Sequence, residues 1–186
     1  KTVYVRHVAV VERGDETVKD FFEKVFRFVD SNDVEKFVLD IRMNSGGNNY
    51  LNKSVITSII QSKKINKYGH LFVITGAATF SAAQNLANEL EKYTEAIFVG
   101  EPTAENVNFW GDVKMETLPL SKLNIKLSRL WWQNMDPRDK RQWTAPNLAA
   151  EMSFENYKAG YDSAMNIILN FKEEKRVDEK IKDLVT

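Results

Sequence analysis

The sequence predicts an α/β domain built around a largely parallel sheet. Two observations support this prediction. Through the first half of the chain, short apolar runs alternate with longer segments in which apolar residues recur at helical spacing. The short runs are nearly continuous in their apolar character, which is typical of strands buried on both faces. One helical segment between each pair of strands is the pattern of right-handed crossovers in a parallel sheet.

Four strands and three helices account for the alternating half. The runs rich in β-branched or apolar residues predict strands at residues 2–11, 36–41, 70–75 and 95–100. Helical spacing predicts helices within residues 14–33, 50–64 and 81–93, the first of them starting near Asp15.

The pattern changes after Gly100. Residues 101–112 contain Pro, Gly and several Asn and are typical of a loop. Partial alternation over residues 113–119 and 123–130 predicts a β-hairpin, and the segment that follows it is irregular. Helical spacing predicts one closing helix at residues 153–171. We therefore expect a single domain over residues 1–171.

The composition excludes several classes of function. The chain has 186 residues with 26 basic and 26 acidic side chains, which argues against a broad nucleic-acid-binding surface. It has no Cys, so a disulfide, a thiol nucleophile and a thiolate metal site are excluded. No apolar run reaches the roughly 20 residues that a membrane-spanning helix needs. We expect a charged, solvated tail at residues 172–186.

No cofactor or metal is expected, because the sequence lacks HExxH, a Cys/His cluster, GxxxxGK[ST] and GxGxxG. Chemistry is expected at the carboxyl ends of the strands, where ligands gather in open α/β sheets. After the second strand, Gly46 and Gly47 precede a helix, so free N–H groups lie there. They could hold an anion or a developing oxyanion, or they could simply make a tight turn.

Ser81 follows the third strand and opens a helix. It could be a nucleophile exposed at the strand tip, although the GxSxG motif is absent, or it could be an N-cap. A Ser beside a Gly-Gly turn supplies two of the three parts that acyl transfer needs. The third part is a base. His7 lies inside a strand, and His70 lies at the amino end of the strand before Ser81, so neither is well placed.

Several segments resemble one family in the same order along the chain. They include "FVLDIRMNSGGNN", "LFVITGAATFSAAQNLANELE" and "AIFVGEPTAENVNFWGD". The family is that of the C-terminal processing peptidases, the tricorn core protease and the interphotoreceptor retinoid-binding protein. The resemblance implies a crotonase-like spiral of βαβ units and a serine-type peptidase. It matches Ser81 to the nucleophile, and it matches Ala82 together with Gly46 or Gly47 to the oxyanion hole.

The chain departs from the family at the base. Where the processing peptidases have a Lys, this sequence has Asn106. The chain looks more similar to the tricorn-like branch, in which a His comes from a segment upstream and an acidic residue follows later. The resemblance therefore implies a base from a segment before Lys1, and Asp136 or Asp139 as the acid partner. Asp40 and Arg42 would be structural residues that hold the Gly-Gly turn.

The leading hypothesis is the C-terminal core of a serine peptidase that acts on a peptide or protein. The alternative is a non-catalytic module that binds a hydrophobic ligand or a peptide on the same fold, as retinoid-binding members do. A weaker alternative is an acyl-CoA enzyme of the crotonase type. The sequence leaves oligomerisation open, and the resemblance implies an extracytoplasmic location because relatives are often exported.

Overall fold

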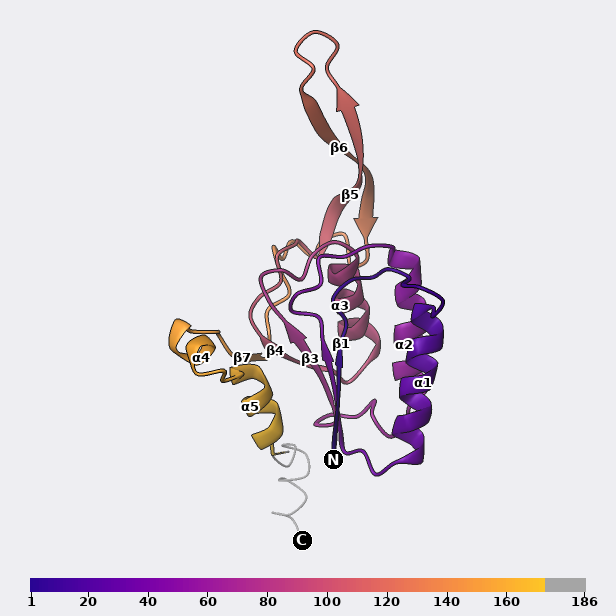
Figure 1. Cartoon of the computed structure of the whole chain (residues 1–186), viewed down its shortest axis with the longest axis vertical. Coiled ribbons are helices and arrows are strands. Elements are labelled where there is room, and N and C mark those ends of the chain that lie inside the picture. Colours follow the sequence, from indigo (N-terminus) through magenta and orange to yellow (C-terminus); the bar gives the residue numbers. More distant parts are fainter. Residues whose placement is uncertain (173–186) are drawn as a thin grey trace.

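A five-stranded parallel sheet lies at the centre of the structure, a computed structural model that describes residues 1–172 (Figure 1). The strand order is β1-β2-β3-β4-β7, and all four pairings are parallel. The strands are β1 Thr2–Arg6, β2 Lys36–Asp40, β3 Leu71–Thr75, β4 Ile97–Gly100 and β7 Leu148–Ala149. The predicted α/β class with a largely parallel sheet is confirmed.

Helices cover both faces of the sheet (Figure 1). One face is covered by α1 Val18–Ser31, α2 Asn52–Gln61 and α3 Ala82–Tyr93, with the short 3₁₀ helix η1 Asn49–Leu51 leading into α2. The other face is covered by α5 Ser163–Asn170, which follows the short helix α4 Phe154–Lys158. None of the helices within residues 1–172 has both the length and the apolar character needed to cross a bilayer.

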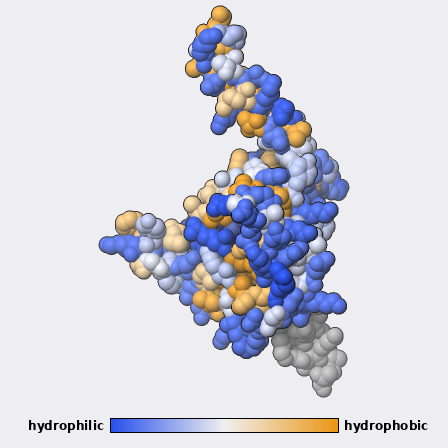
Figure 2. Space-filling model, turned by 45° about the vertical axis from the view of Figure 1, so that its right-hand side comes forward, coloured by the Kyte–Doolittle hydropathy of each residue, from blue (hydrophilic) through white to orange (hydrophobic). Residues whose placement is uncertain are grey.

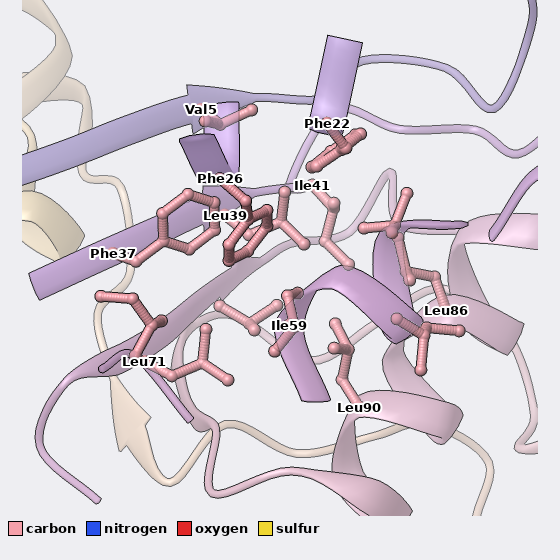
Figure 3. Close-up of a cluster of buried hydrophobic side chains, with 14 of the residues drawn as sticks. Val5, Phe22, Phe26, Phe37, Leu39, Ile41, Ile59, Leu71, Leu86 and Leu90 are labelled. Atoms are coloured by element: carbon pink, nitrogen blue, oxygen red, sulfur yellow. The ribbon is translucent and has the colours of Figure 1, made fainter. Parts of the chain in front are cut away.

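The two covered faces explain why the central strands read as continuous apolar runs. In β2, Phe37 and Leu39 pack toward α1, α2 and α3, whereas Val38 packs toward α5. The alternation follows from the two-residue period of a strand. Figure 3 shows the larger cluster, in which Phe22 and Phe26 of α1 approach the strand residues.

Helix α1 begins later than the predicted start near Asp15, because Thr17 forms its N-cap. The Thr17 hydroxyl accepts a hydrogen bond from the Asp20 N–H at 3.0 Å, and the Asp20 carboxylate accepts one from the Thr17 N–H at 3.4 Å. This reciprocal pair is a capping box, which satisfies two N–H groups that the first helical turn would leave unpaired.

The predicted hairpin is confirmed and projects away from the sheet (Figure 1). It consists of β5 Asn108–Thr117 and β6 Asn124–Gln133, so both strands extend into residues predicted as loop or irregular. The extension contains two cross-strand aromatic pairs, Phe109 with Trp132 and Trp110 with Trp131. Such pairs stabilise antiparallel strands, which explains the added length. Figure 2 shows apolar side chains exposed along the projecting hairpin.

The single closing helix predicted over residues 153–171 is wrong. Two helices, α4 and α5, stand in its place. Gly160 lies between them with φ at +64°, a left-handed conformation that ends a helix. Asp162 then caps α5 by accepting the Met165 N–H at 3.0 Å. The predicted tail, apart from Lys172, lies outside the described residues.

His7 lies just after β1 and is buried against Phe22 of α1, with ring centroids 5.7 Å apart. Burial, with a smaller contribution from Arg13, lowers the pKa of His7 from 6.5 to about 4. The folded state therefore holds His7 neutral at a pH where the unfolded chain binds a proton. Acid must then favour unfolding, because the unfolded state takes up the extra proton.

We predict that the free energy of unfolding falls by about 2 kcal/mol between pH 7 and pH 5 because of His7. Urea denaturation at both pH values measures this change. In His7→Gln, which has no titrating ring, most of the pH dependence in this window should disappear. An equal dependence in the variant would contradict the assignment.

Candidate active site

Three chain segments meet at the edge of the sheet where β2, β3 and β4 end. They are the Gly-Gly turn after β2, the turn at Ser81 after β3, and the segment that contains Glu105 after β4. Together with the base of the hairpin they enclose a cavity of about 680 Å³. Ser81, Ala82, Gly47 and Glu105 all line it. The structure therefore brings three of the predicted site residues, Ser81, Ala82 and Gly47, to one cavity.

Ser81 has a backbone conformation that L-residues rarely adopt. Its φ is 55° and its ψ is −122°, at the point where the chain enters α3. A conformation of this kind costs about 1–3 kcal/mol and tends to persist at functional sites. The hydroxyl makes no capping hydrogen bond to the helix, unlike that of Thr17 at α1. Ser81 therefore occupies the N-cap position of α3, but its side chain does not cap the helix.

Glycine is required at position 46 because the Ser81 turn packs directly against it. A Cβ there would lie 2.7 Å from the Ser81 Cβ and 2.9 Å from both the Ala82 nitrogen and the Phe80 oxygen. Gly46 also has φ at +102°. The Gly-Gly turn therefore does more than reverse the chain, because it lets the two loops of the site touch.

Asn44 joins the loops through buried hydrogen bonds. Its side-chain oxygen accepts the Gly46 N–H at 2.9 Å, and its side-chain NH₂ donates to the His7 carbonyl at 2.9 Å. Its backbone carbonyl accepts the Phe80 N–H at 3.1 Å. The side chain is fully buried. One residue thus connects the end of β1, the Gly-Gly turn and the Ser81 turn.

Asp40 and Arg42 have a different structural role from the one that the resemblance implies. The Arg42 guanidinium bridges Asp40 at the end of β2 to Asp162 at the start of α5, with a 2.7 Å contact to Asp162. Asp40 also accepts a hydrogen bond from the Tyr4 hydroxyl at 2.5 Å. Burial and this carboxylate raise the pKa of Tyr4 to about 12. The bonds that hold the Gly-Gly turn come instead from Asn44.

The backbone N–H groups near Ser81 fall into two classes. The Gly46 N–H is already bonded to the Asn44 side chain. Within residues 1–172, the N–H groups of Gly47 and Ala82 have no hydrogen-bond acceptor, and both residues line the cavity. Of the two glycines that the sequence left open as oxyanion donors, only Gly47 therefore keeps its N–H available.

Gly47 is held in place by the segment that follows β1. The Val10 N–H donates to the Gly46 carbonyl at 2.8 Å, and the Asn48 N–H donates to the Val10 carbonyl at 2.7 Å. A Cβ on Gly47 would lie only 2.2 Å from the Val10 oxygen. The predicted first strand thus ends at Arg6, and its last residues form this separate bridge to the turn.

The remaining candidates lie elsewhere. Neither His7, buried against α1, nor His70, which precedes β3, lines the cavity. Asp136 and Asp139 do not line it either. Arg138 and Arg141 respectively bond to these two carboxylates and lower their pKa values. The predicted acid partners are therefore engaged in ion pairs away from Ser81.

Glu105 was missed as a site residue by sequence reasoning. Its side chain lines the cavity beside Ser81, and burial raises its pKa. The N–H groups of Asn106 and Ser81 lie close enough to lower that pKa by hydrogen bonding, but burial outweighs them. The available signal was its position after "GEPT", where the family often has a small residue and this chain has a carboxylate.

The sequence from the first strand through the hairpin matches a known family. Residues 1–141 match the family model described as Peptidase family S41. The chain belongs to this peptidase family. The match covers the Gly-Gly turn, Ser81 and the segment that contains Glu105, so the cavity of this S41 chain lies wholly within it. No curated protein sequence matches the chain.

Solved structures share the fold at low sequence identity. A protein of Bacteroides fragilis NCTC 9343 assigned to the S41 proteases is 19% identical with a TM-score of 0.62, and the match covers 100% of this chain and 55% of that one. A protein of Parabacteroides merdae ATCC 43184 assigned as a peptidase is 13% identical with a TM-score of 0.65, covering 90% and 60%. Tricorn protease is 14% identical with a TM-score of 0.61, covering 100% and 18%.

This S41 chain therefore spans little more than half the length of the first two of these proteins.

We predict that Ser81→Gly raises the free energy of unfolding by about 1 kcal/mol, because Gly adopts positive φ without strain. Ser81→Ala should leave it within about 0.5 kcal/mol, because the hydroxyl caps nothing. Urea denaturation measures both changes. Thr17→Ala serves as the control, since it removes a capping hydroxyl and should cost about 1 kcal/mol. If Ser81→Gly were less stable than Ser81→Ala, the claim that the Ser81 backbone is strained would be contradicted.

We predict that Gly46→Ala destabilises the fold by more than about 2 kcal/mol, because the new Cβ meets the Ser81 turn in addition to straining the backbone. Gly160→Ala is the matched control. Gly160 also has positive φ, but a Cβ there meets nothing within 4 Å. It should cost about 1 kcal/mol. Equal losses in the two variants, measured by thermal unfolding, would show that the Gly46 contact is unimportant.

Proposed function

We propose that the chain is the core of a serine peptidase in which Ser81 is the nucleophile. The observation that carries this proposal is the strained Ser81 at the start of α3, together with two N–H groups lining the same cavity that have no acceptor among the described residues. Membership of a peptidase family supports the reaction class. The substrate is accordingly a peptide or protein.

The strained turn places the Ser81 hydroxyl where it could attack a substrate in the cavity. Its side chain is half-buried, lines the cavity and is not used in capping. In the proposed reaction the hydroxyl oxygen attacks a peptide carbonyl carbon, and the carbonyl π electrons move onto the oxygen. The N–H groups of Ala82 and Gly47 stabilise that oxyanion, because fixed donors need no reorganisation as the charge develops.

The walls of the cavity fit a peptide chain. Aromatic side chains from the hairpin base, Phe109, Trp110 and Trp132, line the cavity together with Tyr50. Trp110 and Tyr50 are exposed, at 61% and 80%. They offer apolar surface to side chains on either side of the scissile bond.

A purely binding module is less well supported. Such a module has no use for an energetically costly Ser81 conformation, whereas a nucleophile needs its hydroxyl placed away from the helix. The aromatic walls by themselves would suit either function.

The reaction also needs a group that accepts the Ser81 proton. Neither histidine of the chain lines the cavity. The family resemblance suggests a His from a segment outside these 186 residues, and the cavity itself also contains titratable groups.

We predict that a fluorophosphonate probe labels Ser81 in the full product of the gene. Peptide mapping by mass spectrometry locates the modified residue, and Ser81→Ala should abolish labelling. Ser128→Ala is the matched control, because Ser128 lines the same cavity from β6. It should label at the wild-type rate.

Absence of labelling at Ser81, under conditions in which a reference serine hydrolase reacts, would overturn the proposal. Labelling that maps to a different serine would overturn it as well.

A further inference from the structure

The charges that line the cavity are all acidic. Glu105 and Asp112 line it, and no Lys, Arg or His does so within the part of the chain that the structure describes. Asp112 is exposed and already accepts a hydrogen bond from the Trp132 indole N–H at 2.7 Å. Glu105 is therefore the carboxylate of this cavity that is left to meet a ligand.

Glu105 is tied to the loop that ends in Ser81. The N–H of the preceding residue, Ala104, donates to the Thr79 carbonyl at 2.9 Å. Burial raises the pKa of Glu105, and the N–H groups of Asn106 and Ser81 lie close enough to oppose this by hydrogen bonding. The carboxylate thus lies next to the backbone of the proposed nucleophile.

No cationic side chain compensates Glu105 among residues 1–172. None of the ion pairs there involves it, and no charged group contributes to the shift of its pKa. By contrast, Asp136 and Asp139 are each paired with an Arg. A half-buried carboxylate without a counter-ion is a cost to the fold, and such groups are concentrated at functional sites. A cationic ligand would remove this cost.

The aromatic walls of the cavity suit a long basic side chain. Lys and Arg lay their methylene stems along apolar surface while the charged end reaches a polar partner. An aromatic face such as that of Trp110 or Tyr50 also attracts a cation. The cavity volume of about 680 Å³ lies within the range of about 300–1,000 Å³ that is typical of ligand pockets.

We propose that the cavity selects peptides with a Lys or Arg side chain next to the scissile bond, and that Glu105 is the specificity-determining residue that binds the charged group. This inference rests on the proposed role of Ser81 as nucleophile. An acidic side chain at the same place meets an unpaired carboxylate and is rejected. An apolar side chain packs on the aromatic walls but leaves Glu105 without a partner.

The bound cation also affects the chemical step. An ionised Glu105 beside Ser81 opposes the negative charge that develops on the carbonyl oxygen of the substrate. Once it is paired with an ammonium or guanidinium group, Glu105 no longer adds net negative charge to the cavity. A basic substrate should therefore gain in kcat as well as in KM, whereas a contact that only docks the peptide would change KM alone.

The experiment measures peptide cleavage by the full product of the gene. A peptide library of mixed sequence first locates the preferred cleavage site by mass spectrometry, and the residue next to the scissile bond is then varied. Lys is compared with norleucine, which has a similar length but no charge, and with Glu. The kcat/KM should be at least about tenfold higher for the Lys peptide than for the norleucine peptide. The Glu peptide should be the slowest of the three.

Three variants assign this preference to one side chain. Glu105→Gln keeps the shape without the charge and should remove the difference between Lys and norleucine. Glu105→Lys should reverse the preference, so that the Glu peptide is cleaved faster than the Lys peptide. Asp112→Asn is the matched control, because it removes the same charge from the same cavity and should keep the wild-type preference. If Asp112→Asn lost the preference as Glu105→Gln does, the assignment to Glu105 would be wrong.

The outcomes separate this inference from the proposed function. If wild type labels with fluorophosphonate at Ser81 but treats the Lys and norleucine peptides alike, Ser81 remains the nucleophile and the inference is wrong. Where cleavage is too slow to rank the peptides, their protection of Ser81 from labelling measures binding, and equal protection overturns the inference as well. If wild type does not label at Ser81 at all, the proposed function fails and the inference fails with it.

Discussion

The hydrogen bonds of Asn44 are the constraint on which the site depends. Three of its polar groups each bond a different segment: the side-chain NH₂ bonds the His7 carbonyl after β1, the side-chain oxygen bonds the Gly46 N–H, and the backbone carbonyl bonds the Phe80 N–H. The side chain is fully buried, so a lost partner would leave a polar group unpaired away from water. Asn44 therefore contributes to fixing the positions of Gly47 and Ser81 relative to each other.

The same bonds explain which N–H groups remain free. Asn44 occupies the N–H of Gly46, and Val10 bonds on both sides of Gly47 without using its N–H. The turn is therefore held by several hydrogen bonds, yet the Gly47 N–H keeps no acceptor within residues 1–172. A site that stabilises a developing charge needs donors that are already fixed in place. Such donors do not have to reorganise as the charge forms, whereas water molecules do. Gly46 packs on the Ser81 turn, and Gly47 and Ser81 line the same cavity.

The rest of the domain holds Ser81 in its strained backbone conformation. The hydroxyl of Thr79 donates to the Ile41 carbonyl at 2.9 Å and accepts the Gly76 N–H at 3.1 Å, which ties the loop before Ser81 to the end of β2. The fully buried strand β3, which leads into this loop, contributes side chains to both hydrophobic clusters. A local cost of a few kcal/mol is tolerable where the surrounding structure is this well determined.

The sequence by itself determined the fold class, the alternation of strands and helices, and the two turns that meet in the cavity. These follow from local patterns: apolar runs for β2 and β3, helical spacing for α1 and α3, and Gly-Gly and Ser at strand ends. The break of the closing helix at Gly160 was not predicted, because an isolated Gly is an ambiguous signal in a helical pattern. The structure shows the break, since Gly160 has positive φ and Asp162 caps the next helix. Only the tertiary structure decided that Ser81 caps nothing, that Gly47 rather than Gly46 has a free N–H, and that Glu105 rather than Asp136 or Asp139 shares the cavity. Each of these depends on contacts between segments far apart in the chain, and no local pattern records which partner a polar group will find.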